Sequence, residues 1–304
     1  MRAIPVLFVV SILTFVLVSF LPGNAAEALL GATATPDLVA KLQAELGLNE
    51  PLYLSYWHWL TTLAHGSLGS SILDGEPVTK ILNQRIPVTL ALVTGTTLVA
   101  ALIGISLGVV GALRGGVIRR VTDVLTFAGL ALPSFFVGLG LIALFALKWD
   151  LLPPNGYVSP GTSVSRWVES LILPVAAMAV SAVSGIATQT RDATLDVLGR
   201  DFVRVQFANG FSRRSIIWKH VLRNAAPPIV TVIGLVFVSL LSAAVVVESI
   251  FSLPGLGQEV VSAATYHDIP VVQGVVLYFT VMVLIVNLII DLIYSWVDPR
   301  VRVG

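Results

Sequence analysis

The sequence predicts an all-α polytopic membrane protein with six transmembrane helices. Of its 304 residues, 56% are apolar and 12% are charged, whereas a soluble domain carries about 25% charged residues. Six uncharged runs are also long enough to cross a hydrocarbon core, which takes about 20 helical residues. Because backbone polar groups in lipid must pair internally, and because the runs lack the alternation of β-barrel strands, these runs are predicted to be helices.

The six runs follow one another along the whole chain. They are Ala3–Ala26, Ile86–Leu113, Val124–Leu147, Ser170–Thr190, Ala225–Val247 and Ile269–Ile290. The first run could also be a secretory signal, because small residues lie at its end, at 24–26. The run is longer, however, than the apolar region of a secretory signal, which has about 7–15 residues, and Arg2 is the only basic residue before it. An uncleaved first helix is therefore predicted.

The distribution of basic residues predicts the orientation of these helices. If the N-terminus is inside, 13 of the 18 basic residues fall on inner segments. The remaining five fall outside and are Lys41, Lys80, Arg85, Lys148 and Arg166. Cytoplasmic loops are enriched in Lys and Arg, so both termini are predicted to be cytoplasmic. The formal net charge is only +1, and no nucleic-acid partner is expected. The lack of cysteine excludes disulfides and thiolate metal sites.

The segment between the first two runs, residues 27–85, is predicted to be an external region. Thr35 is a plausible N-cap for a helix over Pro36–Leu46. An aromatic strip follows, formed by Tyr53, Tyr56, Trp57 and Trp59. Aromatic residues with a polar group favour the membrane–water interface, so this strip is expected along the outer membrane face.

The loop over residues 191–224 carries most of the functional argument. Apolar residues at 198, 202 and 203, and again at 217 and 221, recur at helical spacing. Gly210 interrupts the pattern, and Ser212 can cap a second helix. The loop is therefore predicted to hold a short helix, a glycine turn and a second amphipathic helix that leads into the fifth run.

Arg213 and Arg214 would occupy the first turn of that second helix. Cations are unfavourable there by a few tenths of a kcal/mol, because the N-terminal end of a helix is positive. An interaction from outside the helix is therefore needed to account for them. Anionic lipid of the inner leaflet and an acidic protein surface are two explanations, and the residues alone do not separate them.

The residues of this loop resemble a known motif. The matching blocks are Asp201-Phe202-Val203-Arg204, Ala208-Asn209-Gly210, and His220-Val221-Leu222-Arg223-Asn224-Ala225 with Pro228. They are similar to the cytoplasmic coupling loop, the EAA motif, of membrane subunits of bacterial ABC importers, and most similar to the dipeptide and oligopeptide permease group. The chain departs from that group at Gln206 and Phe207. Further blocks match in order, including Leu46-Gly47-Leu48-Asn49-Glu50-Pro51-Leu52, Pro254-Gly255-Leu256-Gly257 and Asp298-Pro299-Arg300.

The resemblance implies a domain organisation and a set of partners. It implies a type I ABC importer transmembrane domain with a first helix at 1–26, the external region at 27–85, a five-helix core at 86–297 and the coupling loop at 191–224. Its partners would be a second homologous six-helix permease subunit, two ATPase subunits, an extracytoplasmic substrate-binding protein and membrane lipid. The location would be the bacterial cytoplasmic (inner) membrane.

The energy source is expected on other chains. A Walker A loop ends in Gly-Lys followed by Ser or Thr, but none of the four lysines follows a glycine. The chain is therefore interpreted as a transport subunit rather than an enzyme. ATP and Mg²⁺ are expected on partner subunits, and no cofactor or metal on this chain.

The resemblance also suggests which residues couple transport to ATP hydrolysis. The short helix at 201–210 would dock in a cleft of the ATPase and act as a lever on the spans. The residues assigned to this coupling are Asp201, Arg204, Phe207, Ala208 and Gly210, with Phe207 as an apolar knob.

Polar groups and helix breakers within the spans are candidates for the pore or the subunit interface. Glu248 could face the pore or the partner subunit, or be an interfacial charge. Asn287 and Asp291 share one face of the sixth helix and favour helix packing over substrate binding. Pro133 is predicted to kink the third helix, for packing or for pore shape. Gly104, Gly108 and Gly111 indicate close helix contact, either with a partner subunit or within the chain.

The implied function is ATP-driven import of di- or oligopeptides, with nickel or glutathione as alternative cargo of the same subunit type. A secondary transporter would usually show charged or broken helices at mid-membrane, which the uncharged runs do not favour. An intramembrane enzyme would need paired catalytic groups, and the spans contain none.

Overall fold

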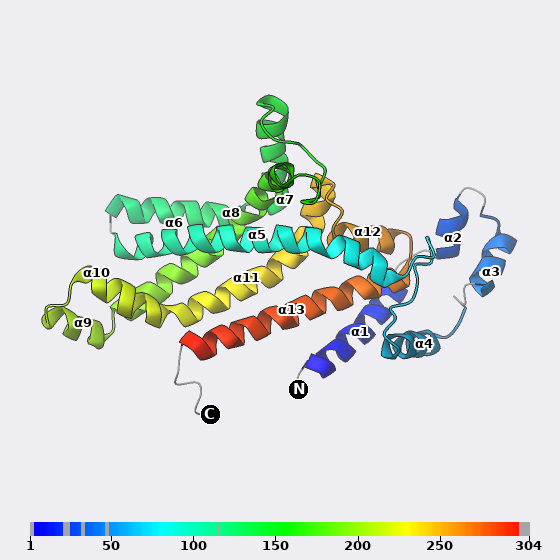
Figure 1. Ribbon diagram of the computed structural model, residues 1–304, viewed down its shortest axis with the longest axis horizontal. Coiled ribbons are helices and arrows are strands. Elements are labelled where there is room, and N and C mark those ends of the chain that lie inside the picture. Colours follow the sequence, from blue (N-terminus) through cyan, green and yellow to red (C-terminus); the bar gives the residue numbers. More distant parts are fainter. Residues whose placement is uncertain (1–2, 21–24, 32–33, 46–48, 115, 298–304) are drawn as a thin grey trace. The chain divides into compact units, whose positions relative to one another are not determined.

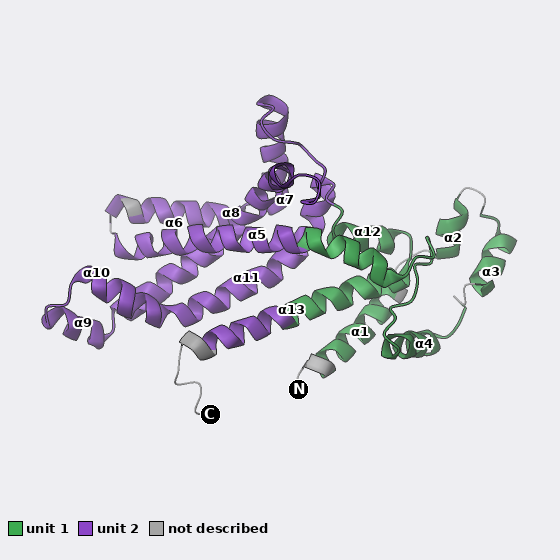
Figure 2. Ribbon diagram, viewed as in Figure 1, with its two compact units in different colours: residues 1–89, 254–284 green, residues 90–253, 285–304 purple. Residues whose placement is uncertain are grey.

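The computed structural model describes residues 3–20, 25–31, 34–45, 49–114 and 116–297. In these ranges the chain is built of helices, with one isolated antiparallel bridge between Ser70 and Pro77. It divides into two compact units, one formed by residues 1–89 and 254–284 and the other by residues 90–253 and 285–304 (Figure 2). The all-α fold class predicted from composition is confirmed.

The first unit contains the N-terminal helices and one later segment, residues 254–284. Its complete helices are α1 (Ala3–Ser19), α2 (Ala25–Leu30), α3 (Pro36–Glu45), α4 (Leu52–Ala64) and α12 (Leu256–Thr265). It also contains the beginnings of α5 (Val78–Leu113) and α13 (Ile269–Val297). The external helix predicted at residue 36 therefore forms, and the aromatic strip lies on α4.

The second unit is organised around one long helix, α8 (Val164–Leu198). It also contains α6 (Gly116–Ala131), α7 (Ser134–Leu141), a π-helical segment η2 (Ile142–Lys148), α9 (Asp201–Ala208), α10 (Arg213–Ser215), a second π-helical segment η3 (Ile216–Val221) and α11 (Leu222–Phe251). Helices α6, α7 and α11 all pack against α8 (Figure 1). α8 is thus the central element of this unit.

Within the part of the chain that the structure describes, four helical stretches are long and apolar enough to cross a membrane. They are Val78–Leu113, Val164–Leu198, Arg213–Phe251 and Ile269–Tyr294. A fifth crossing arises if the bent pair Arg119–Ala131 and Ser134–Lys148 forms one broken span, and Pro5–Val18 is a shorter apolar helix. The apolar helices thus follow the order of the predicted runs.

The third predicted span, Val124–Leu147, is not one continuous helix. Its two halves meet at an angle of 98°. Proline has no N–H to donate to the preceding turn, and Pro133 instead starts a new helix, with its carbonyl accepting the Phe136 N–H at 3.1 Å. The predicted kink is present, but it is a break rather than a bend.

Helix ends also differ from the edges of the apolar runs. α8 continues past Thr190 to Leu198 and ends at Gly199. α5 begins at Val78, ahead of the predicted start at Ile86. α1 ends at Ser19, and Ala25 and Ala26 belong to α2. Charged residues end an apolar run, but they do not end a helix, because they have adequate helix propensity.

The glycines of α5 pack against α8 of the same chain. A Cβ added at Gly108 would lie 2.6 Å from the Ala187 carbonyl oxygen and 2.6 Å from Thr190 Cβ. A Cβ at Gly104 would lie 2.9 Å from Ile186 Cβ. Such distances leave no room for a side chain, so these glycines allow the two helices to approach closely. The sequence allows these glycines to contact either a partner subunit or another helix of the same chain, and the structure shows the contact within the chain.

We predict that Gly108→Ala lowers the thermal unfolding midpoint of the purified chain. Its methyl group would force α5 and α8 apart, at a cost of about 1–3 kcal/mol. Gly140→Ala is the matched control, because Gly140 lies in α7 with nothing within 4 Å of an added Cβ. The control should raise the midpoint, since alanine favours a helix by about 1 kcal/mol over glycine. Equal effects at both positions would contradict the packing argument.

The loops of the first unit are joined by carboxylates. Asp268 is 2% exposed and accepts hydrogen bonds from the Ser71 hydroxyl at 2.5 Å and the Ile72 N–H at 3.2 Å. Glu259 pairs with Arg85 at 2.8 Å. Burial raises the pKa of Glu259, an effect that Arg85 opposes and that Asp268 reinforces. These contacts fix the residue before α13 against the loop before α5, and α12 against α5.

Candidate functional site

The predicted coupling helix is present as α9, and it begins without a side-chain cap. α8 ends at Gly199, and Arg200 adopts an extended conformation (φ −74°, ψ 145°) before Asp201 starts α9. The carboxylate of Asp201 in the first turn favours the positive end of the helix. Arg204 lies 3.5 Å from it, but both side chains are largely exposed, so this ion pair contributes little to stability.

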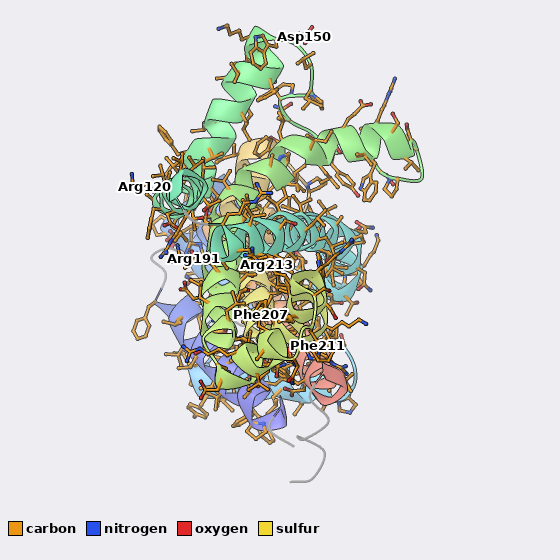
Figure 3. All side chains as sticks on the ribbon, turned by 90° about the vertical axis from the view of Figure 1, so that its left-hand side faces the viewer. Arg120, Asp150, Arg191, Phe207, Phe211 and Arg213 are labelled. Carbon is orange, nitrogen blue, oxygen red and sulfur yellow. The ribbon has the colours of Figure 1, made fainter. Side chains whose placement is uncertain are left out.

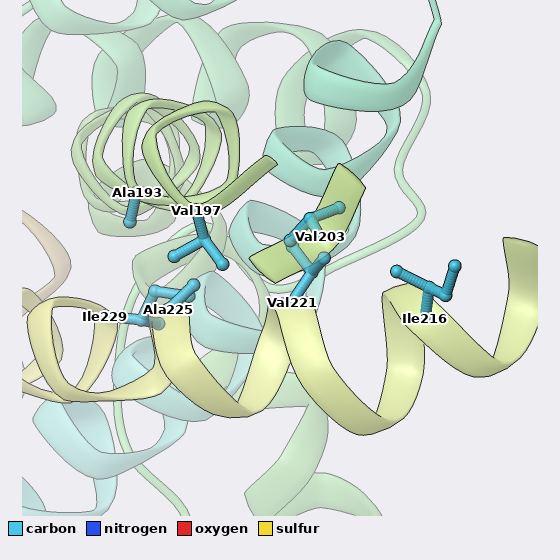
Figure 4. Close-up of a cluster of buried hydrophobic side chains, with 7 residues drawn as sticks. All are labelled: Ala193, Val197, Val203, Ile216, Val221, Ala225 and Ile229. Atoms are coloured by element: carbon cyan, nitrogen blue, oxygen red, sulfur yellow. The ribbon is translucent and has the colours of Figure 1, made fainter. Parts of the chain in front are cut away.

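Val203 anchors α9 to the rest of the second unit. It is 1% exposed and belongs to a buried apolar cluster (Figure 4). The cluster consists of Ala193 and Val197 of α8, Val203, Ile216 and Val221 of η3, and Ala225 and Ile229 of α11. Ile105 of α5 also packs against it. Through this cluster, α9 is joined to η3 and to the residues of α8 and α11 that the cluster contains.

Apart from Val203, most side chains of α9 are exposed in this chain. Val205 is 56% exposed and Phe207 is 45% exposed, and Phe202 and Ala208 are exposed as well. Phe211, just after the helix, is 53% exposed. Exposed apolar groups that lie together indicate a contact surface for another protein or for a membrane. The predicted coupling residues Asp201, Arg204, Phe207 and Ala208 are thus brought together on an accessible helix.

Gly210 ends α9 with a defined hydrogen-bonded turn. Its φ is +79°, a conformation that glycine adopts at no steric cost. The Gly210 N–H donates to the Phe207 carbonyl at 3.1 Å, and the Phe211 N–H donates to the Gln206 carbonyl at 3.2 Å. This pair of bonds is a Schellman motif. The glycine turn predicted from the sequence is confirmed.

Ser212 begins the next helix, as predicted, and Arg213 reaches a distant helix end. The Ser215 N–H donates to the Ser212 hydroxyl at 3.4 Å. The Arg213 guanidinium donates to the carbonyl of Leu113, the last residue of α5, at 3.4 Å. The C-terminal end of a helix is negative, so this cation is favourable there. This contact within the chain accounts for the position of Arg213, although its positive charge is unfavourable at the N-terminal end of its own helix.

Phe207 and Arg213 also line a common cavity of about 380 Å³. The other lining residues are Ala112, Leu113, Leu198 and Ile217. The side chains labelled Phe207, Phe211 and Arg213 gather at this end of the second unit (Figure 3). The ends of α5 and α8, the exposed helix α9 and the start of the α10–η3–α11 helix therefore converge on one region.

The remaining candidate residues lie away from α9. Pro133 is exposed at the start of α7, and Glu248 is 0% exposed near the end of α11. Asn287 and Asp291 are both exposed on α13. No group of three metal-binding side chains was found among the residues that the structure describes.

Two contacts of the second unit have no local signal in the sequence. Arg191 forms an ion pair with Asp123, 68 residues earlier, and so joins α8 to α6. The bond from Arg213 to Leu113 spans 100 residues. Side chains so far apart in the chain are brought together only by the packing of α5, α6 and α8.

The helical arrangement is shared with chains of solved structures. The chain is similar to a chain in an inward-facing structure of the MetNI methionine ABC transporter, with a TM-score of 0.58 and 18% identity over 72% of this chain and 97% of that one. A crystal structure of an amino acid ABC transporter with histidines gives a TM-score of 0.54 and 15% identity, over 71% and 93% of the two chains. These likenesses show the fold.

The chain belongs to the family of binding-protein-dependent transport system inner membrane components, whose model matches residues 78–303. The model of the N-terminal part of such components matches residues 1–93. A relative in Sinorhizobium fredii, named probable peptide ABC transporter permease protein y4tP, is 37% identical over 98% of this chain and 96% of its own length. The dipeptide transport system permease protein DppB of Escherichia coli is 36% identical over 98% of this chain and 96% of its own length. The chain is therefore a membrane-embedded transport subunit.

We predict that Val203→Ala loosens α9 while leaving the spans folded. The variant removes two buried methyl groups, at a local cost of about 2 kcal/mol. Amide hydrogen exchange in α9 should become about tenfold faster or more. Val205→Ala removes the same two groups from an exposed position of the same helix, so exchange should remain close to that of the parent. Equal protection in both variants would show that Val203 is not the anchor.

Proposed function

We propose that this chain is one of two membrane subunits of an ATP-driven importer that carries peptides across the inner membrane. Relatives at 36–37% identity over nearly the full chain are named as peptide and dipeptide permeases. A glutathione transport system permease protein, GsiC of Salmonella typhi, is 34% identical over 98% of the chain. Peptides are therefore the proposed cargo, with glutathione as the second candidate.

The observation that carries the proposal is the position of α9. Val203 attaches it to the buried cluster that includes residues of α8 and α11, while most of its other side chains are open to a partner. A partner that moves α9 would move the ends of two long apolar helices with it. We propose that this partner is the ATPase subunit, and that Asp201, Arg204, Phe207, Ala208 and Gly210 form or shape the contact.

The mechanism needs different contacts in two states of the ATPase. A ligand shifts a conformational equilibrium only if it binds the two conformations with different free energies. ATP, with Mg²⁺, would close a pair of ATPase subunits around the two α9 helices of a permease pair. The apolar spans would then change from an inward-open to an outward-open arrangement and accept cargo from an external binding protein.

This arrangement agrees with the proposed topology. The basic residues of the α9 region would face the cytoplasm, together with both termini. The region before α5 would face outward, where the binding protein docks. The Asn287 and Asp291 side chains, exposed on α13, are proposed to be covered by the second membrane subunit, because polar groups facing lipid are costly. Pro133 and Glu248 remain candidates for shaping the pore or the subunit contact.

We predict that Gly210→Pro abolishes ATP-dependent peptide uptake by a reconstituted four-component system. Proline cannot adopt the positive φ of Gly210, and it lacks the N–H that bonds Phe207. The turn after α9 would be lost, and with it the docking of the ATPase. Membrane insertion of the variant should be unchanged, and uptake at the parental rate would refute the coupling role.

Gly66→Pro is the matched control for this experiment. Gly66 has a φ of +82° directly after α4, and it forms the same pair of bonds, from its N–H to the Leu63 carbonyl and from the Ser67 N–H to the Thr62 carbonyl. The backbone damage is therefore equivalent, but it lies in the proposed external region. This control should bind the ATPase subunits as the parent does, whereas the Gly210 variant should not.

The cargo is tested separately with the parental system. Labelled dipeptides, longer peptides, glutathione and Ni²⁺ are offered to vesicles in parallel, each with the corresponding binding protein. Uptake of a peptide that requires ATP supports the proposal. ATP-dependent uptake of Ni²⁺ alone would retain the importer mechanism and reject the peptide cargo.

A further inference from the structure

A buried polar site lies among apolar side chains of the first unit. It is a cavity lined by residues of α1, α4 and α13. The lining residues are Leu7, Val10, Ser11, Thr14, Trp59, Gln273, Val276, Leu277 and Thr280. Three hydroxyl groups, one indole and one carboxamide thus face a space that is otherwise bounded by aliphatic groups.

Gln273 and Trp59 bring polar atoms into this cavity that have no partner among the described residues. Gln273 is 3% exposed, and both its Oε1 and its Nε2 are buried without a hydrogen bond. Trp59 Nε1 is buried without one as well. Leaving a buried donor or acceptor without a hydrogen bond destabilises a fold. Three such atoms around one cavity therefore indicate a ligand.

The hydroxyl groups add acceptors rather than donors. Ser11 donates to the Phe8 carbonyl, Thr14 to the Val10 carbonyl and Thr280 to the Val276 carbonyl, each at 2.8 Å. The hydrogens of Thr14 and Thr280 are thus engaged within their own helices, and lone pairs remain on both oxygens. Ser11 also shares a hydrogen bond of 2.8 Å with the Tyr56 hydroxyl, so it has fewer free lone pairs than the two threonines. The ligand must accept from the Trp59 and Gln273 N–H groups and donate to an oxygen.

The size of the cavity limits the ligand to a single small molecule. About 10 Å³ is open to the centre of a water-sized sphere, and one water molecule needs about 10–15 Å³ on that scale. A metal cation suits the oxygen atoms, but the N–H groups of Trp59 and Gln273 present positive hydrogens to it. A water molecule satisfies donors and acceptors together.

We propose that the cavity binds one internal water molecule that bridges Trp59 of α4 to Gln273 of α13, beside the hydroxyls of α1. Internal waters that make about three hydrogen bonds are integral parts of a fold. This one joins a helix of the region before α5 to two apolar helices. It does not depend on what the transporter carries or on the ATPase.

The sign of the change in thermal stability tests this site. We expect Gln273→Met and Trp59→Phe each to lower the unfolding midpoint of the full chain by about 2–6 °C, because each leaves the water and the remaining group with too few partners. The double variant should lose less than the sum of the two, since the water is then no longer needed. If the site is dry, Gln273→Met removes two unsatisfied atoms at nearly constant volume and raises the midpoint, which would overturn the proposal.

Matched controls and a direct observation complete the test. Gln84→Met changes an exposed glutamine of α5, and Trp57→Phe changes a tryptophan of α4 that is 60% exposed. Both controls should leave the midpoint near that of the parent. A density map that resolves water should show a peak within hydrogen-bonding distance of Trp59 Nε1 and the Gln273 carboxamide. A direct contact between these two groups, without a peak, would contradict the proposal even if the variants are unstable.

Discussion

The packing of Val203 between the end of α8 and the η3–α11 helix is the interaction on which the account of this transporter subunit depends. α9 has eight residues and no side-chain cap, and isolated helices of this length are not stable in water. Its position is therefore set by tertiary contacts, and Val203 is its one buried side chain. Without that contact, a partner bound to α9 would move a loose loop rather than the spans.

The surrounding contacts extend this attachment to further helices. Arg213 joins the beginning of the α10–η3–α11 helix to the end of α5, while Arg191 joins α8 to α6 through Asp123. The glycines of α5 bring that helix directly against α8. Interiors packed in this way transmit displacement rather than absorb it. A force on α9 therefore reaches α5, α8 and α11 of the second unit together.

Much of this site could be predicted from the sequence, because its signals are local. The short helix, Gly210 and the Ser212 cap follow from residues within four positions of one another. The break at Pro133 was predicted only as a kink, since the angle depends on how α6 and α7 pack against α8. The apolar run predicts a helix end at Thr190, whereas α8 continues to Leu198. The charged residues from 191 onward end the apolar run without ending the helix. The bond from Arg213 to Leu113 and the polar cavity at Gln273 depend on contacts between distant segments, which no local pattern encodes.

The central claim is that α9 and the helices beneath it move as one body. It is tested most directly by attaching spin labels at two exposed positions of the second unit, Asn209 at the end of α9 and Leu235 of α11, in the assembled importer. The distance between the labels is then measured with and without bound ATP. The account predicts the same distance distribution in both states while transport proceeds. A distribution that shifts when ATP binds would show that α9 moves independently of α11, and it would contradict the account.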